Sequence, residues 1–125
     1  MSPGFEPGSA GEAYCYLTTT GRRTGNLHTI EIWFAMPENG RALYVLSGGD
    51  DRSDWVRNLR VDPRVTVRVG SAAAEEHAGT ARPVEVPAED EAARKLLAAK
   101  YQGWHAGEHM SHWARTALCI AIDPE

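Results

Sequence analysis

Two glycines bracket two arginines in the segment Gly21-Arg22-Arg23-Thr24-Gly25, the sharpest chemical pattern in the sequence. Glycines let backbone N–H groups turn toward a ligand, and neighbouring guanidinium groups donate bidentate hydrogen bonds to phosphate or carboxylate oxygens. The segment lacks the Gly-Lys-Ser or Gly-Lys-Thr ending of a Walker loop and the GxGxxG spacing of a dinucleotide-binding turn. It therefore predicts an anion-binding loop of another kind, with an ordinary basic hairpin turn as the alternative.

A second glycine-containing segment, Ser47-Gly48-Gly49, leads through two aspartates to Ser53. Ser53 is a residue type favoured at helix N-caps, and the free N–H groups at a helix start can meet an anionic or carbonyl group of a ligand. The helix that follows carries Trp55 and is expected to stop at Asp62-Pro63. A flexible connection with a capping residue is the alternative interpretation.

Three histidines, His105, His109 and His112, have the spacing i, i+4 and i+7, which on a continuous helix would place them on one face beside Glu108. Such a face could bind Zn or Fe. Two glycines in the same stretch weaken a continuous helix, however, and the spacing fixes no fourth ligand. We therefore expect no metal site and interpret the stretch as a polar lid with imidazoles facing a pocket.

Strands and short helices are expected to position these groups. The clearest strand is His28 to Met36, because Ile30, Ile32, Phe34 and Met36 alternate with Thr29, Glu31, Trp33 and Ala35. A turn at Pro37 to Gly40 makes Arg41 to Ser47 the predicted hairpin partner of that strand. Further strands are expected at 13–20, 65–69, 77–86 and 116–122, and helices at 53–62 and 87–101.

This order of elements has no repeats and no regular alternation of strand and helix. By elimination it favours an antiparallel barrel whose openings are covered by helices. Residues 1–11 are rich in Gly, Pro and Ser and are expected to form a flexible N-terminal arm. Residues 12–125 are expected to form a single domain.

Length and composition further limit the classes of function that the chain can have. A chain of 125 residues with 42% hydrophobic content can build one core, so a redox cofactor and its acceptor would have to share one pocket. The net charge of -4 argues against a nucleic-acid partner. Because no signal peptide or long apolar span is evident, we expect no membrane association and a cytoplasmic location. Cys15 and Cys119 are expected to be buried thiols.

Four fragments in unbroken order carry a resemblance to a known family. They are LTTTGRRTG at 17–25, HTIEIWF at 28–34, LSGG at 46–49 and DWVRNLRVDPRVTVRVG at 54–70. Together they resemble the deazaflavin-dependent nitroreductase and quinone reductase family. The resemblance implies a mainly β (α+β) fold of the FMN-binding type: a split antiparallel β-barrel of about six strands with two or three covering helices. It also makes a homodimer possible.

The resemblance further implies an oxidoreductase that transfers a hydride from reduced coenzyme F420, with FMN as the alternative cofactor, to a quinone, nitroaromatic compound or enone. Two other functions stay open at this point. One is a non-catalytic carrier of a flavin, deazaflavin or lipid-like ligand on the same barrel, and the other is a metal-dependent protein built on the three histidines. The natural acceptor is not implied.

Site residues follow from the resemblance by position. The cofactor's phosphate and acidic tail are expected on Arg22, Arg23, Thr24 and Gly25. The cofactor would lie beside His28, Thr29, Ile30, Glu31, Ile32 and Trp33, its ring would be lined by Leu46, Ser47 and Gly48, and the opposite wall would comprise Asp54, Trp55, Val56, Arg57 and Asn58. Our candidates for the acceptor pocket are Tyr101, Trp104 and His105, with Tyr101 or Ser47 as the proton or hydrogen-bond donor.

Overall fold

In the computed structural model, which describes Phe5 and residues 7–125, the chain forms six strands that curl into one sheet, together with three α-helices. The strands are β1 (Cys15–Thr20), β2 (Leu27–Ile32), β3 (Leu43–Ser47), β4 (Arg64–Val69), β5 (His77–Pro83) and β6 (Leu118–Pro124). The helices are α1 (Asp54–Val61), α2 (Pro87–Gln102) and α3 (His112–Thr116), with short 3-10 turns at Pro7–Gly11 and Asp50–Arg52.

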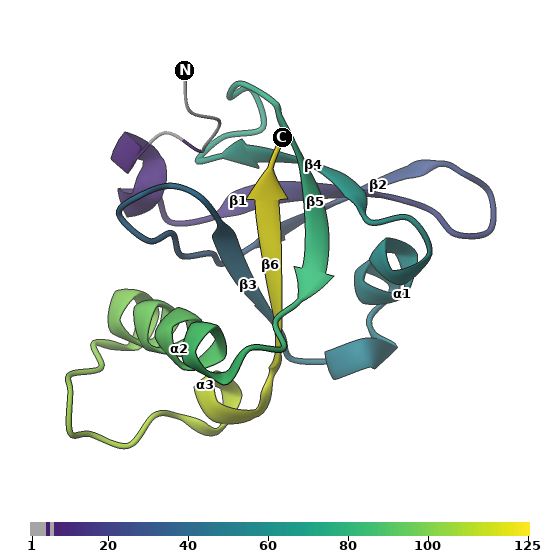
Figure 1. The fold of residues 1–125 in the computed structure, drawn as a ribbon. Helices are drawn as coiled ribbons and strands as arrows, with labels where there is room; N and C mark the ends of the chain where they lie inside the picture. The colour runs from purple at the N-terminus through teal and green to yellow at the C-terminus, as the bar shows by residue number, and fades with distance from the viewer. Residues whose placement is uncertain (1–4, 6) are drawn as a thin grey trace.

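Every strand pair in the sheet is antiparallel, and the strand order is β2-β1-β4-β5-β6-β3. Figure 1 shows β1 and β2 running across the direction of β5 and β6, so the sheet curls into a half-barrel. Such curling lets one sheet enclose a core without a second sheet. The predicted mainly β split barrel of about six strands with covering helices is confirmed.

The predicted hairpin between residues 28–36 and 41–47 is wrong. β2 pairs with β1 and β3 pairs with β6, so β2 and β3 lie at opposite edges of the sheet. A single bridge joins the two segments, in which Ala35 and Tyr44 exchange hydrogen bonds of 3.0 and 2.8 Å. The turn residues predict only a reversal of chain direction, whereas the pairing depends on the long-range contacts that each strand gains in the barrel.

The alternation predicted for residues 28–36 persists beyond the end of β2 at Ile32. Ile30 and Ile32 pack against the barrel core, and Phe34 and Met36 belong to it. Ala35 is also buried, but in a second apolar cluster that lies against α2. Both faces of the segment are therefore covered after Trp33, although its sequence pattern resembles that of a strand with one solvated face.

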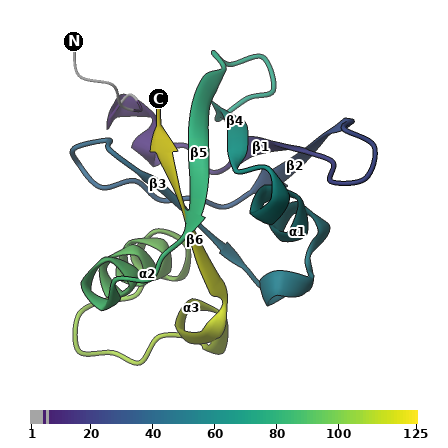
Figure 2. The same ribbon diagram turned by 45° about the vertical axis from the view of Figure 1, so that its right-hand side comes forward.

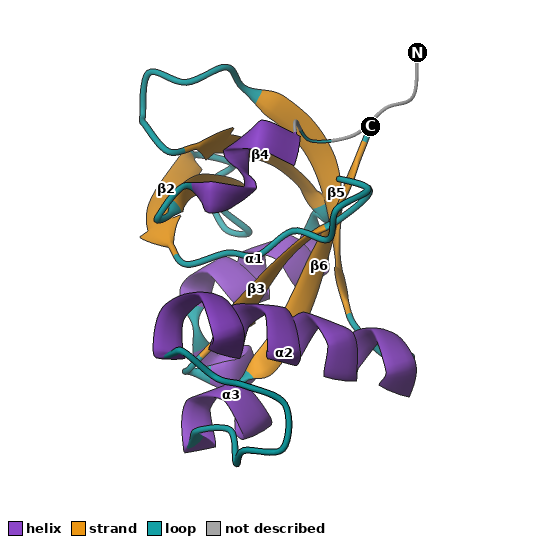
Figure 3. Ribbon diagram, turned by 90° about the vertical axis from the view of Figure 1, so that its left-hand side faces the viewer, coloured by secondary structure: helices purple, strands orange, loops and turns teal. Residues whose placement is uncertain are grey.

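The two apolar clusters correspond to the two layers of the molecule. The first fills the barrel with side chains that include Leu17, Phe34, Val67 and Ile120. The second joins β3 and β6 to α2 through small residues and Leu97. Figure 2 shows α1 and α2 on opposite sides of β5 and β6, and Figure 3 shows α3 packed beneath α2. The cysteines are buried as expected, and burial raises the pKa of each thiol to about 12.

An ionic network fixes the start of α2 to the sheet. The Arg82 guanidinium pairs with Glu89 at 2.8 Å and with Asp123 at 2.7 Å, and the Tyr44 hydroxyl donates to Glu89 at 2.8 Å. Hydrogen bonds from Arg82 and Tyr44 hold the pKa of Glu89 at about 2. Residues from β3, β5, β6 and α2 thereby meet at one point.

The predicted arm at residues 1–11 falls partly outside the described residues, which omit 1–4 and 6. Within the described part, Pro7–Gly11 forms a 3-10 turn. Phe5 is only 3% exposed, belongs to the barrel core and donates its backbone N–H to the Gly40 carbonyl at 2.9 Å. Phe5 therefore contributes to the folded core although its surroundings in sequence lack apolar periodicity.

Candidate functional site

The connection between β1 and β2, residues 21–26, forms a closed loop that we call the cationic loop. Its base is fixed by hydrogen bonds from the Gly21 N–H to the Asn26 carbonyl at 2.7 Å and from the Gly25 N–H to the Gly21 carbonyl at 2.9 Å. Gly25 has a φ of 79°, which glycine adopts without strain. A Cβ on Gly21 would lie 2.9 Å from both the Asn26 carbonyl oxygen and the His28 ring. The two bracketing glycines are thus required by backbone geometry.

The two arginines of the cationic loop have different environments. The Arg22 side chain, 20% exposed, donates to Asn58 Oδ1 at 2.8 Å and to Asp54 Oδ1 at 3.3 Å. Asn58 is 4% exposed and also accepts the Arg22 backbone N–H at 3.2 Å. Arg23 is exposed and has no hydrogen-bond or ion-pair partner in the described part of the chain. Arg22 therefore fastens the loop to α1, and Arg23 keeps its charge available.

A pocket of about 740 Å³ lies between the cationic loop, β2 and α1, and we call it the cradle pocket. It brings together most of the residues expected to hold the cofactor tail. The lining residues are Gly21, Arg22, Arg23, Thr24, Asn26, Leu27, His28, Thr29, Ile30, Asp54, Trp55 and Asn58.

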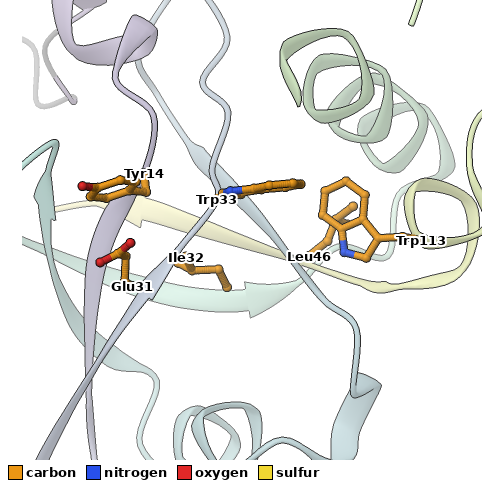
Figure 4. Close-up of a pocket in the computed structure, with 6 residues that line it drawn as sticks. All are labelled: Tyr14, Glu31, Ile32, Trp33, Leu46 and Trp113. Atoms are coloured by element: carbon orange, nitrogen blue, oxygen red, sulfur yellow. The ribbon is translucent and has the colours of Figure 1, made fainter. Parts of the chain in front are cut away.

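The next residues of β2 line a second pocket, of about 320 Å³, which we call the aromatic pocket. Its lining residues are Tyr14, Glu31, Ile32, Trp33, Leu46 and Trp113. Figure 4 shows Tyr14 and Glu31 at one end and Trp33, Leu46 and Trp113 at the other. Because Ile30 lines the cradle pocket and Glu31 the aromatic pocket, the two pockets adjoin along one strand.

Ring contacts fix the aromatic end of this pocket. Trp33 stacks on Tyr101 with ring centroids 4.4 Å apart and planes 2° from parallel. Trp33 also meets Trp113 edge to face at 5.5 Å. Although Trp33 is 46% exposed, these contacts hold its indole ring in one orientation. The pocket therefore presents a fixed flat aromatic surface.

The two candidate donors, Tyr101 and Ser47, are both engaged with the protein. The Tyr101 hydroxyl lies 3.0 Å from the Phe34 N–H and 2.7 Å from the Ala13 carbonyl, and burial raises the pKa of Tyr101. The Ser47 hydroxyl is buried 3.0 Å from that of Ser53. Neither residue lines the cradle pocket or the aromatic pocket. Tyr101 instead lies behind Trp33.

The structure does not bring Trp104 and His105 together with the aromatic pocket. Both lie in the loop between α2 and α3, where the Trp104 indole N–H donates to the Glu108 carbonyl at 2.9 Å. Trp104 lines a separate pocket of about 410 Å³ with Gln102, Gly103, Glu108, His109, Met110 and Ser111. His105, His109 and His112 are exposed, and no group of three or more metal-ligating side chains converges among the described residues.

The remaining residues expected at the site differ in their burial and in the pockets that they line. Leu46 lines the aromatic pocket, and Gly48 is exposed at a position where an added Cβ would lie 3.9 Å from the Trp113 ring. Val56 is fully buried on the inner face of α1, and the Arg57 side chain donates to the Asp51 carbonyl at 3.3 Å. Tyr14 and Trp113 also line the aromatic pocket but were not among the expected site residues, since neither belongs to the four motif fragments. For Trp113 the sequence held one signal, the content of four tryptophans in 125 residues.

The family assignment follows from the sequence as a whole. A model of the family described as F420H(2)-dependent quinone reductase matches residues 8–123, nearly the whole chain. The chain belongs to this family. It is therefore an enzyme, an oxidoreductase that uses coenzyme F420. No curated protein matches the sequence significantly.

Solved structures share the fold of this chain. A conserved hypothetical protein from Mycobacterium tuberculosis matches with a TM-score of 0.78 at 17% identity, covering 100% of this chain and 84% of that one. An F420-H2 dependent reductase (FDR-A) matches with a TM-score of 0.66 at 23% identity, covering 89% and 94%. A protein described as F420 reductase matches with a TM-score of 0.64 at 19% identity, covering 99% and 96%.

The residues of this family member fit coenzyme F420, which carries a flat ring and an acidic tail. The cradle pocket offers the uncommitted guanidinium of Arg23 beside Thr24 and His28, a donor set suited to negatively charged oxygens. The adjoining aromatic pocket offers flat indole faces, beside which the ring of the coenzyme and a planar acceptor can meet. Among the described residues, none of the helices has the length and apolar character needed to cross a bilayer.

Proposed function

We propose that this protein is a quinone reductase in which the cradle pocket holds the acidic tail of coenzyme F420 and the aromatic pocket receives a planar acceptor. The observation that carries the proposal is that the two pockets adjoin along β2, through Ile30 in one and Glu31 and Ile32 in the other. When bound, the reduced coenzyme supplies a hydride. The single domain then holds the hydride donor and the acceptor next to each other. The protein orients the two molecules and provides the charges and hydrogen bonds around them.

Within this proposal the residues of the cationic loop have two roles: some bind the ligand and others position the loop. Arg23, with the Thr24 hydroxyl, binds phosphate and carboxylate oxygens of the tail. Arg22 and Asn58 position the loop, because their hydrogen bonds of 2.8 and 3.2 Å fix both the side chain and the backbone of Arg22 against α1. A loop held before binding loses little conformational freedom when the ligand arrives.

The acceptor would lie against Trp33 and Trp113. An extended π-system gains from stacking on an indole face, and Trp113 meets Trp33 edge to face beside that surface. Quinones are planar and apolar in their carbon skeleton, so they fit this surface better than a branched aliphatic acceptor does. Tyr101 acts as a positioning residue, since its ring supports Trp33 and its hydroxyl is bonded to the backbone.

The test follows oxidation of reduced F420 by a panel of quinones, nitroaromatic compounds and enones. We expect quinones to have the highest kcat/KM, and an absence of quinone turnover would contradict the proposal. Calorimetric titration of F420 with the Arg23→Ala variant is expected to show an affinity loss of roughly 10- to 100-fold, because a charge-assisted hydrogen bond is removed. Arg41→Ala removes the same charge from an exposed turn outside both pockets and should leave the affinity unchanged.

A further inference from the structure

The aromatic pocket has a charged end that the proposed function does not use. Glu31 is the last but one residue of β2, with its side chain exposed, and lies opposite Tyr16 of β1. In Figure 4 its carboxylate lies beneath Tyr14, on the side of Ile32 away from Trp113. The pocket thus has a negative charge at one end and indole faces at the other.

No cation of the described residues neutralises this carboxylate. Glu31 takes part in none of the ion pairs of the described residues, and its hydrogen-bonding neighbour is the uncharged hydroxyl of Tyr16, which is in turn hydrogen-bonded to Tyr14. Burial and the adjacent Glu31 charge raise the pKa of Tyr16, so this phenol stays neutral near pH 7. Arg68 lies opposite Tyr16 on β4 but is paired with Glu76 at 3.1 Å.

The aromatic faces of the pocket favour the same ligand charge as the Glu31 carboxylate does. Tyr14, Trp33 and Trp113 all line the pocket, and the face of an aromatic ring attracts a cation through its quadrupole. An anion gains nothing from these faces and is repelled by Glu31. Both features therefore favour the same charge on a ligand.

We propose that Glu31 is a specificity-determining residue, which makes the aromatic pocket prefer acceptors carrying a cationic group and discriminate against anionic ones. This inference rests on the proposed function, because it assigns a substrate class to the pocket named there. A planar acceptor with an ammonium substituent would place its ring against Trp33 and its charge toward Glu31. A sulfonate or carboxylate substituent would meet the Glu31 carboxylate instead.

The experiment compares three naphthoquinones that differ in one substituent: a trimethylammonium-methyl group, hydrogen or a sulfonate group. Values of kcat/KM are measured with reduced F420 for the wild type, for Glu31→Gln, and for Glu38→Gln as a control. Glu38 is an exposed carboxylate in the turn before β3 and lines neither pocket named here. Because substituents also change the intrinsic reactivity of the quinone, the decisive quantity is the change in the ammonium-to-sulfonate ratio between wild type and variant.

We expect this ratio to fall about tenfold in Glu31→Gln. The substitution removes both the attraction of the ammonium group by a partly exposed carboxylate and the repulsion of the sulfonate group. The ratio should stay unchanged in Glu38→Gln. The wild-type ratio should also fall as salt is added, since exposed charges are screened, while the Glu31→Gln ratio should respond less. An unchanged ratio in Glu31→Gln would overturn the inference.

The experiment distinguishes failure of the proposed function from failure of this inference. If the unsubstituted quinone is not reduced, the proposal that quinones are the acceptors fails. Binding of the charged quinones can still be measured by calorimetry on protein loaded with oxidised F420. A preference for the ammonium compound that depends on Glu31 would support the inference even then. Equal dissociation constants for the ammonium and sulfonate compounds would overturn it without reference to turnover.

Discussion

The cradle pocket and the aromatic pocket share a strand but are built by different interactions. Directional hydrogen bonds define the first, where Asn58 and Asp54 hold Arg22 and leave Arg23 to a ligand. Ring packing defines the second, where Tyr101 and Trp113 fix Trp33. Under the proposed function one strand serves two kinds of recognition, because charge and hydrogen bonds would select an anionic tail and flat aromatic faces would select a planar ring. The two pockets should therefore respond to different mutations.

The largest change in stability is expected from Asn58→Ala, which removes the hydrogen bonds that hold the cationic loop at the cradle pocket. Asn58 is 4% exposed, accepts two hydrogen bonds from Arg22 and donates to Thr19 at 3.3 Å. Leaving these buried partners unsatisfied should cost about 2–4 kcal/mol of unfolding free energy, measured by urea denaturation. The loosened loop should also weaken F420 binding roughly tenfold, since a disordered loop must be reordered on binding.

In the same variant, kcat for a quinone at saturating F420 should change by no more than about threefold, because the aromatic pocket is untouched. The control is Asn39→Ala, which removes a single exposed hydrogen bond to the Arg41 N–H. A fall in kcat as large as the loss of F420 affinity would contradict the division between the pockets.

A pair of substitutions at Tyr101 addresses the aromatic pocket. Tyr101→Ala removes the ring stacked on Trp33, and we expect kcat/KM for quinones to fall about tenfold while F420 affinity is retained, because orientation of the acceptor is lost. Tyr101→Phe keeps the ring and removes only the hydroxyl bonded to Phe34 and Ala13. It should cost about 1 kcal/mol in stability and change kcat by less than about threefold.

These Tyr101 variants also separate positioning from proton transfer. A general acid typically contributes 10²- to 10⁴-fold to the rate. A decrease of that size in Tyr101→Phe, with an altered pH profile of kcat, would assign Tyr101 to proton donation and contradict the positioning role. Stopped-flow measurement of a single turnover isolates the step concerned.

The smallest effect is expected from Glu89→Gln, which acts on neither pocket directly but loosens the helix that carries Tyr101. The folded-state pKa of Glu89, about 2, lies below its ordinary value of 4.5. Its ion pair therefore stabilises the fold above about pH 4.5, and this stabilisation is lost as the pH falls toward 2. Since the pair is partly exposed, we expect a loss of about 1 kcal/mol at neutral pH.

The difference in unfolding free energy between Glu89→Gln and the wild type should shrink steadily below pH 4.5, as measured by urea denaturation across that range. Glu91→Gln on the same helix is the control, because its pairing with Lys95 is solvent-exposed and should contribute only a few tenths of a kcal/mol. A difference that does not vary with pH would show that Glu89 acts by packing and not by charge.

Local patterns made much of the fold predictable. Alternating residues predict the face of β2 and its continuation through Phe34 and Met36, and the residue before α1 has the type and conformation of an N-cap. Strand pairing was not predictable from the Pro37–Gly40 turn, because a turn fixes chain direction only locally. The short helix α3 was missed as well, since it is a single turn inside a stretch of mixed character.

The sequence by itself determined the glycine-bracketed loop with its two arginines, because Gly21 to Gly25 are contiguous and no tertiary contact is needed to bring them together. It also determined the family, through motifs spread along the chain. Only the tertiary structure decided that Arg22 is committed to Asn58 while Arg23 is available, and that Tyr14, Glu31, Leu46 and Trp113 line one pocket. The physical reason is distance along the chain: hydrogen bonds and ring contacts between residues far apart in sequence exist only once the barrel has closed.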